Sequence, residues 1–116
     1  MLRIPKAIPS ALLTATAAVY YQAPALTTAT VNNLSLTNTN ATGGAAVAVT
    51  MHRVPSGGTP GLANQILSAF SIVPGQTLVP NQAIGLQLEA GMTLQVLATV
   101  AGVVSLSGGV YETSGS

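Results

Sequence analysis

Few side chains in this sequence could take part in chemistry. Apart from three tyrosines, the ionisable groups are Arg3, Lys6, His52, Arg53, Glu89 and Glu112, and the chain contains neither cysteine nor aspartate. General acid–base catalysis uses two titratable groups held in different environments. Glu89 falls in a predicted turn and Glu112 near the end of a predicted strand. We therefore expect both carboxylates to be solvated charges and not a catalytic pair.

His52 is the only histidine, and a zinc site needs three or four ligands. We expect it to be a partly exposed or hydrogen-bonded strand residue. A nucleophilic triad could combine His52 only with a glutamate and one of many serines, and no nucleophile-elbow motif indicates which serine. We predict no catalytic residues, no cofactor and no metal, so an enzyme is the least favoured class of function.

The paired tyrosines and paired glycines have plain structural interpretations. Tyr20 and Tyr21 point to opposite faces of a strand, so we expect one ring in the core and the other at the rim, and not a carbohydrate-stacking pair. None of the three Gly-Gly pairs lies between a strand and a helix with a following lysine, which excludes phosphate loops. Gly108-Gly109 lies inside the last predicted strand. There it predicts a β-bulge or the close approach of another backbone.

The overall composition excludes several classes of protein. Charged residues make up 4% of the chain, against about 25% in an average soluble protein, and hydrophobic residues make up 48%, which excludes ordinary disorder. Three basic side chains are too few to form the positively charged surface that binds nucleic acid. No window approaches the roughly 20 apolar residues of a membrane helix. Residues 3–19 faintly resemble a signal peptide, but two prolines and alternating threonines interrupt the pattern.

Alternation with a period of two dominates the rest of the chain. It predicts about eight short strands, over residues 11–21, 28–37, 45–54, 65–72, 77–79, 84–88, 92–100 and 103–113. Residues 62–73 also show some helical spacing, but the strand interpretation fits better. We expect turns at 38–44 and 55–61, and a hairpin around Ala101-Gly102. Strands about ten residues apart are typical of an antiparallel β-sandwich or jelly roll, here a single domain over 11–113 with a tail at 114–116.

Residues 1–10 contain two prolines and no alternation, which predicts an extended N-terminal arm that contacts a neighbouring subunit. The candidate contact residues are Leu2, Arg3, Ile4, Pro5, Lys6, Ile8 and Pro9. Strand faces rich in Thr, Asn, Gln and Ser, with almost no Lys or Glu, suit burial against other subunits, because uncharged sheet edges invite pairing. We expect a homo-oligomer such as a trimer.

Four segments carry a family resemblance: residues 31–40, 52–59, 86–95 and 107–113. The first is a predicted strand rich in Asn and Thr, and the second is a predicted strand that ends in Val-Pro-Ser-Gly-Gly. The third contains the turn Glu89-Ala90-Gly91, and the fourth is Ser-Gly-Gly-Val-Tyr-Glu-Thr. From about residue 12 to 113 the chain thus resembles a family of small structural proteins of tailed bacteriophages. Met92 stands where the family often has aspartate, which removes a turn-capping side chain but keeps the turn.

The resemblance implies a β-sandwich virion component without catalytic residues to carry over. The leading hypothesis is a capsid decoration or cement subunit, which binds copies of itself and the major capsid protein or another virion protein. The alternative is a head-fibre or tail and neck adaptor that binds another tail protein or a host surface, with an aromatic or polar pocket near residues 55–61. Either implies a place on the capsid surface or tail, host cytoplasm during assembly, and no nucleic-acid or membrane partner.

Overall fold

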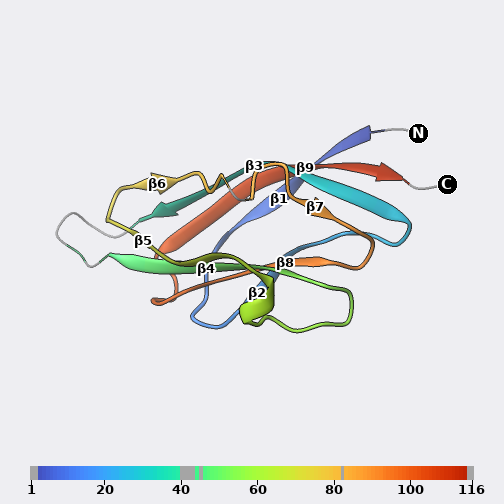
Figure 1. Cartoon of the computed structure of the whole chain (residues 1–116). Coiled ribbons are helices and arrows are strands. Elements are labelled where there is room, and N and C mark those ends of the chain that lie inside the picture. Colours follow the sequence, from blue (N-terminus) through green and yellow to red (C-terminus); the bar gives the residue numbers. More distant parts are fainter. Residues whose placement is uncertain (1–2, 40–43, 45, 82, 115–116) are drawn as a thin grey trace.

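The computed structural model describes residues 3–39, 44, 46–81 and 83–114, and within them nine strands form two antiparallel sheets packed face to face (Figure 1). The first sheet has the order β1 (Arg3–Leu12), β9 (Val104–Ser114), β3 (Thr27–Asn38) and β6 (Thr77–Leu78), and β7 (Gln87–Leu88) also pairs with β3. The second has the order β2 (Ala18–Gln22), β8 (Thr93–Ala98), β4 (Val47–Val54) and β5 (Gln65–Ile72). A 3-10 turn, η1 (Leu62–Asn64), precedes β5. The predicted all-β antiparallel sandwich is confirmed.

The strand order is that of a jelly roll. With the two-residue β7 set aside, the neighbouring pairs β1–β9, β2–β8, β3–β6 and β4–β5 are nested along the chain and fall alternately in the first and the second sheet. This is the arrangement of one long hairpin rolled into two layers. It places the first and last strands side by side in one sheet.

Alternation along each strand supplies the core between the sheets. In β8, Leu94, Val96 and Ala98 are buried, and the residues between them are half-buried. Burying a side chain of valine or leucine size stabilises a fold by about 1.5–3 kcal/mol. The largest fully buried side chains come from both sheets and from the Leu13 corner: Leu13, Leu34, Leu36, Met51, Ile72, Leu88, Leu94 and Leu106.

The N-terminus differs from the predicted arm. The described residues 3–10 belong to β1, which pairs antiparallel with β9 of the same chain from Arg3↔Thr113 onward. Ile8 is 2% exposed and belongs to the core. Because β1 is an edge strand, Pro5 and Pro9 can lie in it without breaking a ladder on both sides.

Two further strand predictions need correction. The predicted strand over 11–21 is interrupted, because the chain crosses from the first sheet to the second at residues 13–17, where the fully buried Leu13 holds the corner. The predicted hairpin at Ala101-Gly102 is instead a tight connection between the two sheets. Gly102 has the positive φ of 80° that the turn requires, but β8 and β9 pair with other strands.

Gly108 lies where two neighbouring strands are irregular, as predicted. β1 changes register between Ile8 and Ala11, and β3 changes register between Val31 and Asn33. A Cβ atom on Gly108 would lie 2.4 Å from the backbone oxygen of Asn33. Glycine is therefore required here by the close approach of β3. Most of the predicted turn at 38–44 and most of the predicted tail at 114–116 lie outside the described residues.

Candidate functional site

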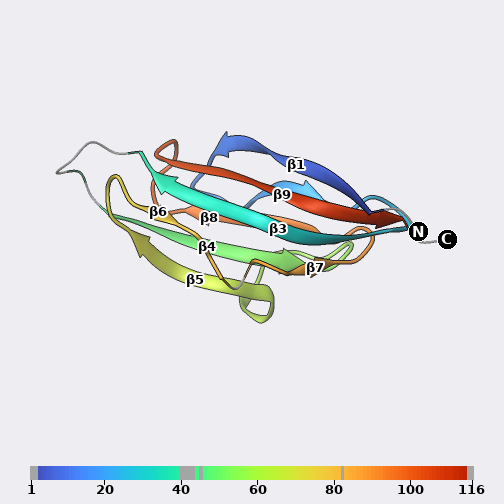
Figure 2. The ribbon, with the colours of Figure 1, turned by 90° about the horizontal axis from the view of Figure 1, so that it is seen from above.

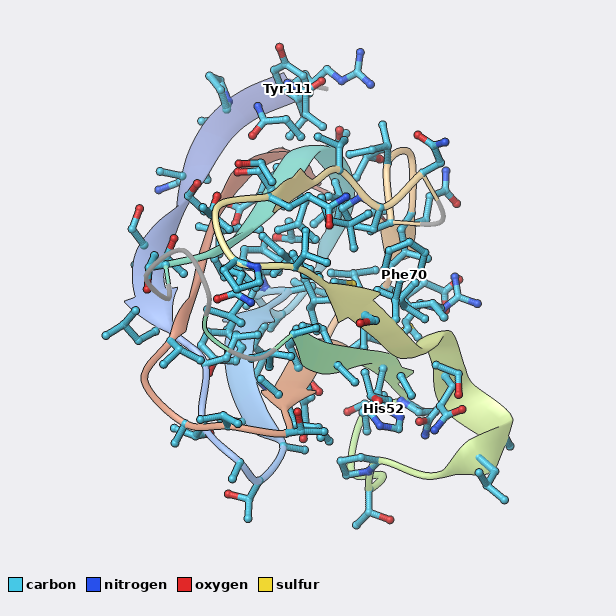
Figure 3. The ribbon with its side chains drawn as sticks, turned by 90° about the vertical axis from the view of Figure 1, so that its left-hand side faces the viewer. His52, Phe70 and Tyr111 are labelled. Carbon is cyan, nitrogen blue, oxygen red and sulfur yellow. The ribbon has the colours of Figure 1, made fainter. Side chains whose placement is uncertain are left out.

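The charged and aromatic side chains are distributed over separate parts of the sandwich. Figure 3 shows Tyr111 at the outer side of the first sheet. It shows His52 beside the second sheet, and Phe70 next to β5. The guanidinium of Arg3 stacks 4.9 Å from the Tyr111 ring centroid, which gives a cation–π contact at the surface. Within the described ranges, no three His, Asp or Glu side chains gather closely enough to hold a metal ion.

Glu112 has a specific partner, so the prediction of a plain solvated charge is wrong. Its carboxylate accepts a 2.5 Å hydrogen bond from the Tyr21 hydroxyl across the sandwich, from β9 in the first sheet to β2 in the second. Both side chains are half-buried. Burial raises the pKa of Tyr21 far above its usual value, and the hydrogen bond to Glu112 and the negative charge of Glu112 raise it further. The pair joins the sheets and keeps Tyr21 neutral.

His52 is buried under the loop that follows β4. Its Nδ1 lies 2.9 Å from Asn64 Oδ1, which also accepts from the backbone N–H of Gly61. Because both contacts need Oδ1 as acceptor, His52 carries its proton on Nδ1. The Asn64 amide nitrogen donates to Thr59 O at 2.9 Å, so one side chain fastens the loop to the sheet. The expected role of His52 as a hydrogen-bonded strand residue agrees with this geometry.

The predicted subunit-contact residues do not form one exposed surface. Arg3, Ile4, Pro5, Lys6 and Pro9 are exposed along β1, whereas Ile8 is in the core. Leu2 lies outside the described residues. A contact through this strand would therefore use its exposed residues and leave Ile8 inside the fold.

The outer face of the first sheet is rich in hydroxyl groups. Ser35 and Ser107 Oγ atoms are 3.1 Å apart across β3 and β9, and Thr37 and Thr77 Oγ1 atoms are 3.0 Å apart across β3 and β6. A hollow of about 320 Å³ surrounds the glycine pair of β9, between β1 and the bulge of β3. Asn32, Asn33 and Tyr111 stand around it.

A larger hollow of about 510 Å³ lies at one end of the sandwich, between the turn at 23–26, Ser56 and Ala90-Gly91. Leu26 in this turn has a φ of 58°, a left-handed conformation that costs a branched side chain about 1–2 kcal/mol, and it is 79% exposed. The turn holds an apolar side chain in solvent at an energetic cost. The sequence predicts an aromatic or polar pocket near residues 55–61, but Ser56 is the one residue of that range that lines this hollow, and the lining is mainly apolar and lacks an aromatic ring.

The sequence did not indicate the exposed apolar residues on the β5 side. Phe70 and Val73 lie in and just after β5, and Val79 and Ile84 lie between β6 and β7; all four are substantially exposed. Strand alternation alone does not show which edge of a sandwich stays open. The absence of Asp, Glu, Lys and Arg from residues 54–88 is not a specific signal, because residues 7–52 lack them as well.

No protein-family model, curated protein or solved structure matched the chain. Among the described residues, no helix has the length and apolar character needed to span a bilayer.

Proposed function

We propose that this chain is a virion structural protein of tailed bacteriophages, a capsid decoration or cement subunit that acts by burying neutral surface against other protein subunits. The family resemblance of residues 31–40, 52–59, 86–95 and 107–113 supports the phage setting. The jelly-roll sandwich is in keeping with a structural role.

The observation that carries this proposal is the neutral surface of the β5, β6 and β7 side. β5, β6 and β7 all come from a stretch of the sequence, residues 54–88, that contains no Asp, Glu, Lys or Arg, and Phe70, Val79 and Ile84 in this stretch are exposed. Burying apolar and uncharged surface is favourable and leaves no unpaired charge behind. A protein that works as a free monomer is better protected by scattered charges. Permanent contact with other subunits explains both the exposed apolar residues and the missing charges.

The test is to mix the purified protein with empty phage capsids and to locate it by cryo-electron microscopy. Ordered density at capsid symmetry axes is the expected result. Absence of binding to heads, together with density at the tail or neck, would overturn the decoration role.

The contribution of β1 needs variants that keep the fold. Deleting residues 2–9 would remove the core residue Ile8 and most of a strand, so a failure to bind would be uninformative. Replacing the exposed pair Ile4 and Lys6 by serine leaves Ile8 in place. If β1 contacts the capsid, this double variant keeps its melting temperature and loses binding. Unchanged binding would remove β1 from the contact surface.

The alternative is a head-fibre or tail adaptor, and one observation favours it. The 510 Å³ hollow at the loop end is lined by Leu26, Ser56 and neighbouring turn residues, which would suit an apolar side chain of another tail protein. Substitution of Ser56 by tryptophan fills this hollow without touching β1 or β5. Loss of tail association with normal folding supports the adaptor, and unchanged association counts against it.

A further inference from the structure

The bulge in β3 points two neighbouring asparagines to the same side of the first sheet. The register of β3 against β9 shifts between Val31 and Asn33, so that Asn32 is the extra residue. Strict alternation would place Asn32 and Asn33 on opposite faces. Val31 and Leu34 are instead both in the core, and the two asparagines between them are both exposed. The bulge thus gathers two amide side chains on the outer face, since bulges re-aim side chains.

These asparagines stand at one side of the hollow of about 320 Å³ on this face, and a tyrosine stands at the other, so we call it the amide hollow. Because Val110 is buried, its neighbours Gly109 and Tyr111 point to the outer face of β9. Gly109 has no side chain, and Ala7, its partner on β1, has a small one. Figure 2 shows β1, β9 and β3 side by side. The amide hollow is the depression that the two small residues leave between the amides and the ring.

The polar side chains around the amide hollow differ from the others on this face. Elsewhere the hydroxyl groups pair with each other, as Ser35 does with Ser107 at 3.1 Å. Among the described residues, neither the side-chain amides of Asn32 and Asn33 nor the hydroxyl of Tyr111 makes a hydrogen bond. These donors and acceptors are therefore available to a ligand.

No charged group is aimed into the amide hollow. Lys6 is the one charged residue among those described that line it, but Lys6 pairs with the buried Val110. Opposite residues of an antiparallel pair point to the same face, so the Lys6 side chain leaves from the inner side of the sheet. Its backbone oxygen is the part that approaches the hollow, 3.3 Å from where a Cβ on Gly109 would lie. The guanidinium of Arg3 lies over the Tyr111 ring and outside the lining.

These features restrict the class of ligand. An ion would find no opposite charge aimed at it. An apolar molecule would cover the amides of Asn32 and Asn33 without replacing their hydrogen bonds to water, which is unfavourable. The occupant must therefore be neutral and must carry several groups that both donate and accept hydrogen bonds.

We infer that the amide hollow binds one ring of a neutral saccharide. Each asparagine amide offers two N–H donors and a carbonyl acceptor, which match sugar hydroxyl groups. The ring of Tyr111 offers apolar surface to the C–H groups of a sugar. Ligand sites have volumes of about 300–1,000 Å³, so a hollow of about 320 Å³ has room for a single ring. The inference goes beyond the proposed function, because sugar binding needs no contact with a capsid.

The test is a titration of the purified full chain with the methyl glycosides of glucose, galactose, mannose and N-acetylglucosamine, followed in amide NMR spectra. At least one sugar should shift the side-chain signals of Asn32 and Asn33 and the backbone signal of Gly109. The signal of Gly91, at the hollow at the end of the sandwich, should stay in place. The double variant Asn32→Ala, Asn33→Ala should bind the same sugar about 10-fold more weakly or worse, because it lacks both amides.

The matched control is the double variant Ser35→Ala, Ser107→Ala, which removes two polar groups from the same face but outside the lining of the amide hollow. It should bind the sugar as the natural chain does. Circular dichroism verifies that both double variants fold. If the asparagine variant does not fold, Tyr111→Ala tests the same hollow and should also weaken binding.

The possible results separate this inference from the proposed function. If none of the four sugars shifts the amide hollow at about 10 mM, the inference is overturned even if the chain decorates capsids. Signal shifts confined to other residues, or equal weakening in the two double variants, overturn the location. A sugar that the natural chain binds and the asparagine variant does not supports the inference even if no capsid is bound, and in that case only the proposed function fails.

Discussion

The hydroxyl of Tyr21 on β2 donates a hydrogen bond to the Glu112 carboxylate on β9 and so connects the two sheets. Replacing Tyr21 by phenylalanine removes the donor and leaves a half-buried carboxylate without it. We expect a loss of about 1–2 kcal/mol in the free energy of unfolding, measured by urea denaturation.

The adjacent residue offers a matched control for that substitution. The Tyr20 hydroxyl is exposed and makes only a long, 3.5 Å contact with Leu12 O. Tyr20→Phe should therefore change stability by less than about 0.5 kcal/mol. Equal losses in the two variants would show that the inter-sheet bond contributes nothing specific.

The same pair makes stability depend on pH in the alkaline range. The pKa of Tyr21 is raised in the folded state from about 10, so above pH 10 the unfolded chain releases this proton and the folded chain keeps it. The folded form then binds more protons, and stability falls as pH rises past 10. Below pH 10 this contribution is fully present. Denaturation midpoints between pH 8 and 11 should decline for the natural chain and decline less for Tyr21→Phe.

Gly108 cannot accept a side chain. A methyl group at this position meets the backbone oxygen of Asn33 at 2.4 Å, and neither β3 nor β9 can move away without losing ladder hydrogen bonds. Gly108→Ala should cost about 2–3 kcal/mol. Gly61→Ala is the control, because a Cβ there meets nothing within 4 Å. A melting temperature lowered by about 8 °C or more in Gly108→Ala alone is the expected result, and similar melting in both contradicts the steric argument.

Leu26 holds a left-handed conformation while most of its side chain is in solvent. Leu26→Gly removes the backbone strain and loses little packing, so it should stabilise the fold by about 0.5–1 kcal/mol. Leu62→Gly, at a leucine that is also largely exposed but has no positive φ, should not stabilise it. The melting temperatures of the two variants test this prediction. If both substitutions raise the melting temperature, or neither does, the backbone of Leu26 is not strained.

The fold class follows from local pattern, because alternation records which strand face is buried. Val47, Val49 and Met51 fall on one predicted face and are all in the core. His52 falls on the opposite face and is nevertheless buried, because the loop containing Asn64 folds back over it. Coverage by a distant loop leaves no trace in strand periodicity.

Long-range pairing is the other information that local pattern lacks. The segment with Pro5 and Pro9 shows no alternation, yet it is a strand because β9 supplies its partner from the far end of the chain. Phe70 likewise pairs with the buried Val49 and so lies on the inner face of the second sheet, yet it is 43% exposed, because β5 is the edge strand of that sheet. The absence of charged residues from 54–88 was visible in the sequence. The position of β5, β6 and β7 on one side of the molecule (Figure 2) was not.

The pairing of β1 with β9 also has a consequence for how the chain is made. Ile8 and Gly108 are partners 100 positions apart, so at a synthesis rate of about 5–20 residues per second β1 is made on the order of ten seconds before β9, the strand with which it pairs. Closing so long a loop makes this a slow-folding topology. Proline and lysine discourage the pairing of an exposed strand, so we expect Pro5, Pro9 and Lys6 to limit aggregation of the nascent chain during that interval.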